Sequence, residues 1–130
     1  MRITTWNINS VRLRIGLALK LLGQSKPDVL CLQETKCPDE QFPFEAFRDI
    51  GYKYIAVNGM KAYNGVALIS RVPFESELAL DWTERSDCRH ISGVFPGDIE
   101  IHNFYVPAGG DEHDIETNEK LAHKLDFIRE

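Results

Sequence analysis

The sequence predicts an α/β domain with one mixed β-sheet and flanking helices. Two observations favour this class. The chain opens with an apolar run, a helical repeat and a second apolar run, which is the pattern of a parallel β-α-β unit. Further along, short apolar segments alternate with turn residues, as they do in antiparallel sheets. Because the chain has 130 residues, 43% of them hydrophobic, and no linker or internal repeat, we expect one compact unit.

Two strands are predicted over residues 2–7 and 28–33, and the first helix is predicted between them. Its apolar residues recur with the helical period and share one face. Asn9 or Ser10 can cap its N-terminus, and Gly23 and Pro27 are predicted to stop it. The face consists of Val11, Ile15, Ala18 and Leu22.

A short helix over residues 44–50, ended by Gly51, is predicted after a loop. Short strands separated by turn signals come next, and Pro96-Gly97-Asp98 is expected to form a hairpin turn. Residues 114–130 return to a helical pattern, with Ile115, Leu121, Leu125 and Ile128 toward one side. The predicted strands cover residues 52–58, 65–70, 75–80, 90–95 and 99–106.

Composition narrows the class of protein. No apolar run approaches the length of a membrane-spanning helix, and the N-terminus lacks the layout of a signal peptide, so we expect a cytoplasmic protein with no membrane partner. The net charge of −5 argues against a generic nucleic-acid binder. Charge is uneven, however: residues 1–27 contain no acid, whereas residues 111–119 are strongly acidic. The three cysteines include no C-x-x-C pair and support neither a disulfide framework nor a zinc site.

Polar side chains come directly after three of the predicted strands. The apolar run that ends at Leu32 is followed at once by Gln33 and Glu34, so a buried strand delivers a carboxylate to its C-terminal end. Mg²⁺ favours one or two carboxylates and keeps several waters, which suits Glu34; the alternative is a surface glutamate paired with Lys36 or a neighbouring arginine. Asn7 and Tyr105 also come at the ends of apolar strands. We therefore expect Asn7, Glu34 and Tyr105 to share one cleft.

Three segments carry a family resemblance: W-N-I-N at residues 6–9, L-Q-E-T-K at 32–36 and F-Y-V-P at 104–107. Together they resemble the exonuclease III branch of the endonuclease/exonuclease/phosphatase superfamily, which includes the AP endonucleases. The resemblance implies that Glu34 is the metal ligand, for Mg²⁺ or Mn²⁺, and that Asn9 supports the metal. It also implies catalytic roles for Asn7, which would orient a carboxylate, and for Tyr105, which would reach the scissile phosphate.

The same resemblance implies DNA contacts by Lys36, Tyr63, Asn64 and Arg89. Arginine suits phosphate because its fork donates two hydrogen bonds, but a salt bridge from Arg89 to Asp87 or Glu84 is an equal alternative. Tyr63 and Asn64 are compatible with an ordinary turn as well. The family often has a polar amide after the proline of F-Y-V-P, whereas this chain has Ala108, which departs from the pattern.

The implied fold is a four-layer α/β sandwich, of which residues 1–130 would supply the N-terminal half as a single partial domain. The implied reaction is metal-dependent phosphodiester hydrolysis at abasic sites and 3′ ends of duplex DNA. Since the family's other catalytic groups lie in the second half, we expect the chain alone to be inactive and to self-associate through an uncovered sheet face. Two alternatives stay open: another phosphoesterase of the superfamily, acting on inositol phosphates or sphingolipids, and a degenerate, non-catalytic α/β binding module.

Overall fold

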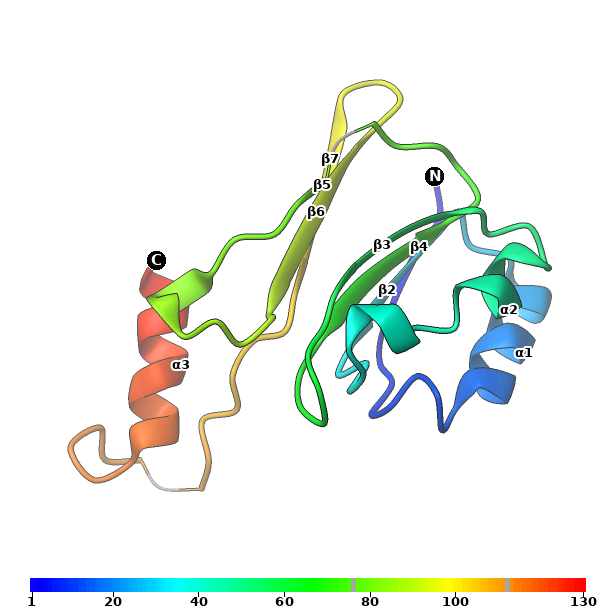
Figure 1. Cartoon of the computed structure of the whole chain (residues 1–130). Coiled ribbons are helices and arrows are strands. Elements are labelled where there is room, and N and C mark those ends of the chain that lie inside the picture. The colour runs from blue at the N-terminus through cyan, green and yellow to red at the C-terminus, as the bar shows by residue number, and fades with distance from the viewer. Residues whose placement is uncertain (76, 112) are drawn as a thin grey trace.

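The strands of the chain divide between two sheets that lie face to face (Figure 1). The computed structural model describes residues 1–75, 77–111 and 113–130. Ser76, inside the strand predicted over residues 75–80, and Glu112, inside the acidic segment, lie outside the described residues. The elements are β1 (Ile3–Asn7), α1 (Ile15–Ser25), β2 (Val29–Gln33), η1 (Asp39–Gln41), α2 (Phe44–Arg48), β3 (Tyr54–Asn58), β4 (Val66–Ser70), β5 (Glu77–Leu78), η2 (Trp82–Glu84), β6 (His90–Phe95), β7 (Ile99–Phe104) and α3 (Glu119–Arg129).

The first sheet is mixed, as predicted, and contains four strands in the order β1-β2-β4-β3. The β1 and β2 strands are parallel and connected through α1, whereas β4 is antiparallel to both of its neighbours. The predicted β-α-β opening and the α/β class are therefore confirmed. Helices α1 and α2 cover the outer face of this sheet (Figure 1).

The expectation of a single sheet is wrong. Strands β5, β6 and β7 form a separate three-stranded sheet, in which β6 and β7 are joined by the predicted turn at residues 96–98. An alternating apolar pattern identifies a strand but not its partner, because backbone hydrogen bonding between strands is the same for any sequence. The four layers thus run from α1 and α2 through the two sheets to α3 (Figure 1).

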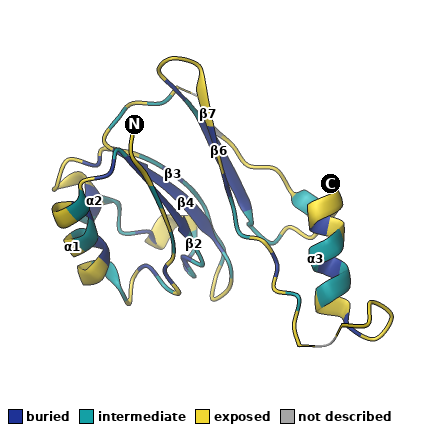
Figure 2. Ribbon diagram, turned by 180° about the vertical axis from the view of Figure 1, so that it is seen from behind, coloured by how far each residue is buried: buried dark blue, intermediate teal, exposed yellow. Residues whose placement is uncertain are grey.

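The β2 strand is buried on both faces, which explains its uninterrupted apolar run. Leu30 and Leu32 pack toward the helices, whereas Val29 and Cys31 pack against the three-stranded sheet. The β1 strand lies at the edge and is covered on one face only. Its residues Ile3, Thr5 and Asn7, in register with Val29, Cys31 and Gln33, are exposed. Figure 2 shows the buried strands between exposed outer elements.

Two helix boundaries differ from prediction for local reasons. The first helix begins at Ile15, because residues 11–14 form turns in which the Ser10 hydroxyl accepts a hydrogen bond from the Leu13 amide (3.2 Å). Asn9 is not the cap. The helix continues past Gly23 to Ser25 and ends where Lys26 adopts the left-handed conformation.

The last helix is shorter than predicted and buries a different face. It begins after Asn118, whose side-chain oxygen accepts hydrogen bonds from the amides of Lys120 and Leu121. His123 and Phe127 are its buried residues, whereas Ile115, which precedes the helix, and Ile128 are exposed. The apolar period was misleading because the helix packs on an aromatic cluster, where a histidine and a phenylalanine fit.

Candidate functional site

The C-terminal ends of β1 and β2 lie side by side at one edge of the four-stranded sheet. Asn7 is in register with Gln33, and the Ile8 amide donates to the Gln33 carbonyl oxygen (3.0 Å). Asn7 and Glu34 therefore share one end of the sheet, as we predicted from the parallel pairing. Asn7 is exposed and Glu34 is half-buried.

The segment that carries Glu34 is held by backbone hydrogen bonds from both sides. The amides of Ser10 and Val11 donate to the carbonyl oxygens of Glu34 and Thr35 (2.8 and 3.1 Å). On the other side, the Thr35 amide donates to the Gly65 carbonyl oxygen (3.1 Å). A Cβ atom at Gly65 would lie 2.2 Å from the Thr35 hydroxyl oxygen, so glycine is required where these loops meet.

Left-handed backbone concentrates in the same place. Positive φ angles occur at Asn9 (49°), Ser10 (85°), Glu34 (57°) and Lys36 (53°). Such conformations are costly for residues with a Cβ, and they gather at binding and catalytic sites. A second group of left-handed residues, Thr83, Glu84, Ser86 and Cys88, lies in and after η2, so this backbone conformation alone does not distinguish the edge.

Tyr105 comes to Glu34 from the second sheet. Burial is the largest cause that raises the pKa of the Tyr105 phenol, and the negative charge of Glu34 and a hydrogen bond with it raise this pKa further. The nearby Arg89 acts in the opposite direction. Two predicted site residues from distant parts of the sequence thus lie near each other.

Arg89 completes this arrangement. Its guanidinium carbon lies 4.7 Å from the centre of the Tyr105 ring, and its Nη1 donates to the Tyr105 carbonyl oxygen (3.2 Å). Its Nε also forms a salt bridge with Asp87 Oδ2 (2.5 Å). The alternative salt bridge is therefore present, and it fixes the guanidinium over the tyrosine ring, with 12% of the Arg89 side chain exposed.

The Lys36 ammonium lies between two of the predicted metal-site residues. Its Nζ donates to Asn9 Oδ1 (2.5 Å) and lies 3.9 Å from Glu34 Oε1. This ammonium is a cation held by the carboxylate and amide oxygens that a magnesium ion would use. The donor set fits a hard divalent ion that keeps most of its waters. Within the described parts of the chain, no group of three or more His, Cys, Asp or Glu residues is arranged to hold a metal.

The two residues predicted to bind DNA from the loop between β3 and β4 have different environments. Tyr63 is 70% exposed and is free to contact a partner. Asn64, in contrast, donates from Nδ2 to the Asp87 carbonyl oxygen (2.8 Å), and it precedes Gly65 in left-handed conformation. The turn interpretation thus describes the structural role of Asn64, which ties its loop to the segment before Arg89.

Sequence reasoning missed the polar residues between the sheets. Asn103 is 3% exposed, and Gln33 donates to it. Asn58 donates from Nδ2 to the His90 carbonyl oxygen (2.9 Å), beside Arg89. An asparagine within the strand pattern of residues 99–106 was a signal for Asn103, but its partner Gln33 lies 70 residues away in the sequence and could not be identified.

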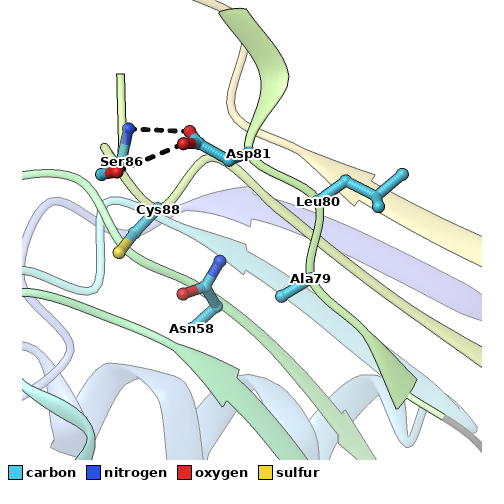
Figure 3. A pocket seen from close by; sticks show the side chains of 6 residues that line it. All are labelled: Asn58, Ala79, Leu80, Asp81, Ser86 and Cys88. Atoms are coloured by element: carbon cyan, nitrogen blue, oxygen red, sulfur yellow. Dashed lines mark hydrogen bonds between the residues drawn. The ribbon is translucent and has the colours of Figure 1, made fainter. Parts of the chain in front are cut away.

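A separate cavity of about 230 Å³ opens beside the segment before Arg89 (Figure 3). Asp81 lines it and accepts hydrogen bonds from the amide and hydroxyl of Ser86 (2.7 and 3.2 Å). Burial, more than any neighbouring charge, raises the pKa of the Cys88 thiol in its wall. A carboxylate and a protonated thiol do not favour a phosphate, so this cavity is not part of the candidate site. Asn58, Ala79 and Leu80 complete its lining.

Comparison with known proteins identifies the family. The profile of the endonuclease/exonuclease/phosphatase family matches residues 4–129. The chain belongs to this family. Exodeoxyribonuclease III of Haemophilus influenzae is 37% identical over an alignment that covers 98% of the chain and 46% of that relative. The resemblance drawn from the three motifs is therefore confirmed.

Solved structures of the family agree with this assignment. An AP endonuclease from Archaeoglobus fulgidus superposes with a TM-score of 0.87 and 35% identity, over 99% of the chain and 48% of that structure. A Neisseria 3′ phosphatase bound to a product DNA hairpin gives a TM-score of 0.79 and 32% identity, over 99% of the chain and 51% of that structure. The chain spans about half the length of these relatives. Among the described residues, no helix is long and apolar enough to cross a membrane.

Proposed function

We propose that the chain supplies one half of a DNA-repair nuclease of the exodeoxyribonuclease III and AP endonuclease type. Its reaction would be hydrolysis of phosphodiester bonds at abasic sites and 3′ ends of duplex DNA, with Mg²⁺ or Mn²⁺ as cofactor. The observation that carries the proposal is the convergence of Glu34, Tyr105 and Arg89 at one edge of the sheet, in a chain of this family.

Glu34 would be the protein ligand of the metal, with Asn9 as its support. A bound divalent ion would stabilise negative charge on the oxygen that leaves phosphorus. Because the Lys36 ammonium now lies against Asn9 and near Glu34, it would have to move aside, which would free it to contact a DNA phosphate.

Tyr105 and Arg89 would act on the scissile phosphate. The ordinary tyrosine pKa of about 10 already keeps the phenol protonated near neutral pH, and the pKa of Tyr105 is raised further, so its hydroxyl can donate a hydrogen bond to a phosphate oxygen. The Arg89 guanidinium is held over the ring and brings positive charge to the same place. Asn7, exposed at the end of β1, would orient a group supplied from outside the described residues.

The contacts to duplex DNA would come from Lys36, Tyr63 and Arg89, with Asn64 fixing the loop that presents Tyr63. An exposed aromatic ring next to basic side chains suits a nucleic-acid groove or backbone. The chain carries a net charge of −5, however, so we expect weak binding of DNA by the chain alone.

We also propose that residues 1–130 form a partial domain that is inactive alone. Glu34 is the carboxylate of the candidate site, and a second group is needed to activate the attacking water. The isolated chain would self-associate through the β1 side, where Ile3 is 48% exposed and Leu17 is 57% exposed. A groove of about 420 Å³ on this side is lined in part by Trp6, Leu17 and Leu21. Sedimentation of the chain and of Leu17→Lys would test this association.

The function is tested with a fusion protein that joins residues 1–130 to the remaining half of the Archaeoglobus fulgidus AP endonuclease. We expect it to cleave a duplex with one abasic site and to digest a recessed 3′ end, with both activities removed by EDTA. The chain alone and the other half alone are the controls, and we expect neither to turn over. Hydrolysis of an inositol phosphate or a sphingolipid with DNA left intact would support another branch of the superfamily. DNA binding without any hydrolysis would support a non-catalytic module.

A further inference from the structure

A buried carboxamide joins the two sheets beside the candidate site. Asn103, on β7, is 3% exposed and points into the apolar layer between the sheets, among residues such as Cys31, Leu68 and Ile91. A carboxamide in such a layer is costly unless all of its hydrogen-bonding groups are satisfied. An aliphatic residue of similar size would pack there without this requirement, so the amide calls for an explanation.

The side-chain hydrogen bonds of Asn103 all reach the four-stranded sheet. Its Nδ2 donates to the carbonyl oxygens of Leu32 and Ala67 (both 2.9 Å), which are paired across β2 and β4. These two acceptors fix the orientation of the amide, so that Oδ1 faces Gln33. Gln33 Nε2 donates to Asn103 Oδ1 (2.7 Å) and to Thr5 Oγ1 (2.9 Å). Asn103 thereby joins β7 to β1, β2 and β4.

The position of this link along both strands ties it to the site. Gln33 directly precedes Glu34, and Asn103 lies two residues before Tyr105. The two sheets have separate backbone ladders, so side-chain hydrogen bonds of this kind fix how β7 sits along β2. Apolar packing between sheets tolerates small shifts, whereas a hydrogen bond of 2.7 Å tolerates little change in length.

We propose that Asn103 and Gln33 are positioning residues that hold the Tyr105 side chain beside Glu34. The purpose of this arrangement, a phosphate held next to a metal ligand, rests on the proposed function. The link itself does not, because it is defined by the chain's own hydrogen bonds. Asn58 provides a similar bridge to the carbonyl oxygen of His90, next to Arg89, so both site residues of the second sheet are anchored by amides of this type.

The proposal is tested by the coupling between Tyr105 and Glu34 in unfolding equilibria. Tyr105→Phe, Glu34→Gln and the double variant are unfolded with urea in two backgrounds, the unsubstituted chain and Gln33→Met. In the first background, we expect the two substitutions to be non-additive by about three- to tenfold in the unfolding equilibrium constant, as for one polar interaction between neighbouring side chains. In Gln33→Met, which leaves the hydrogen bonds of Asn103 to Leu32 and Ala67 in place, the coupling should fall toward a factor of one.

Gln33→Met is the primary variant because Gln33 is half-buried and its loss leaves fewer buried groups unpaired than Asn103→Leu does. Asn103→Leu removes all three hydrogen bonds of the link and should reduce the coupling further. Thr5→Val is the matched control: it removes the hydrogen bond from Gln33 to Thr5, keeps the link to Asn103 and should leave the coupling intact.

A merely structural role would lower stability in Gln33→Met but leave the coupling unchanged, and that result would overturn the proposal. Absence of coupling in the unsubstituted chain would overturn it too. Since no turnover is measured, failure here is distinguishable from failure of the proposed function, which the fusion protein tests separately.

Discussion

Two regions of this molecule contain groups of polar side chains, and the two groups differ in whether their hydrogen-bonding atoms have partners. At the edge formed by β1 and β2, Asn7 is exposed and Glu34 is half-buried. On the outer face of the three-stranded sheet, under α3, polar groups are hydrogen-bonded to one another. We call the first region the Glu34 edge and the second the aromatic cluster, which consists of Trp82, His90, His102, Phe104 and Phe127.

The aromatic cluster contains a directed chain of hydrogen bonds. The Leu80 amide donates to His90 Nδ1 (3.0 Å), so neutral His90 carries its proton on Nε2 and donates it to His102 Nδ1 (2.9 Å). His102 Nε2 in turn donates to Glu100 Oε1 (2.9 Å). The rings stack on their neighbours, with Trp82 and His90 5.4 Å apart between centroids.

Histidines and carboxylates therefore do not mark a site by themselves. In the aromatic cluster both nitrogens of His90 and of His102 have partners, and the rings fix how η2 and α3 pack. At the Glu34 edge, by contrast, the Lys36 ammonium lies 3.9 Å from the carboxylate, beyond hydrogen-bond distance. We therefore assign chemistry to the edge and structure to the cluster.

The largest effect is expected from Glu34→Gln in the fusion protein. Loss of a side chain that merely hydrogen-bonds a metal ligand typically lowers metal affinity or activity by about 10- to 100-fold, so loss of the ligand itself should lower metal-dependent cleavage by at least about 100-fold. Glu45→Gln, at an exposed carboxylate that pairs with Arg48, is the matched control and should leave the rate unchanged. Normal cleavage by Glu34→Gln would remove Glu34 from the metal site.

The aromatic cluster should respond in stability and not in metal binding. Phe127 is 4% exposed and packs edge-on against Phe104, so Phe127→Ala should lower the free energy of unfolding by about 3 kcal/mol. Ile128→Ala, next to it and 61% exposed, should change this free energy by less than about 0.5 kcal/mol. Urea titration measures both. Equal effects of the two variants would show that α3 is not docked as described.

The cluster should also make stability depend on pH. Burial, more than the neighbouring His102, lowers the pKa of His90, and burial is likewise the largest cause that lowers the pKa of His123. Such a histidine binds its proton more readily in the unfolded chain, so stability should fall as the pH falls below the ordinary histidine value of about 6.5.

This dependence is measured by the change in the urea midpoint from about pH 7.5 to about pH 5.5, a range that spans the ordinary histidine pKa. His90→Phe should be less stable throughout but should lose less on acidification than the unsubstituted chain. His113→Asn, at an exposed histidine, should decline as the unsubstituted chain does. A decline in His90→Phe as steep as that of the unsubstituted chain would contradict the buried, neutral state of His90.

The smallest expected effect is that of Lys36→Met on the affinity for Mn²⁺. Removal of a competing positive charge near the metal should strengthen Mn²⁺ binding by the isolated chain, and Lys36→Met should lower the dissociation constant by about fivefold. Lys61→Met removes an exposed lysine from the loop between β3 and β4 and is the control. Calorimetric titration compares them. Weaker binding by Lys36→Met would mean that the ammonium assists the metal instead of competing with it.

The sequence was informative where function depends on the residues at the end of a strand. Glu34 directly succeeds an apolar run, and Asn7 ends one on a parallel neighbour, so their common edge was predictable from local pattern. Asn64 shows the limit of that reasoning, because a turn residue and a DNA contact have the same local pattern, and only its hydrogen bond to Asp87 distinguishes them.

Long-range relations were not predictable. The division of the strands between two sheets depends on which strand β5 finds as its partner, and no residue of β5 encodes that choice locally. The prediction of which face of α3 is buried was wrong for a related reason. Its histidine at position 123 is buried because Thr83 and Asp87 lie nearby, at 3.3 and 3.9 Å from Nε2, and both are distant in sequence.

The division between the two regions is tested most directly with Mn²⁺ and the isotope-labelled 130-residue chain. Mn²⁺ broadens the NMR signals of nearby nuclei, and the amide spectrum reports on the whole chain at once. We predict that substoichiometric Mn²⁺ broadens residues 7–10 and 33–36 together with Tyr105, and that Glu34→Gln removes this broadening. Broadening centred on His90, His102 and Glu100 would contradict the account, because it would place the metal in the aromatic cluster.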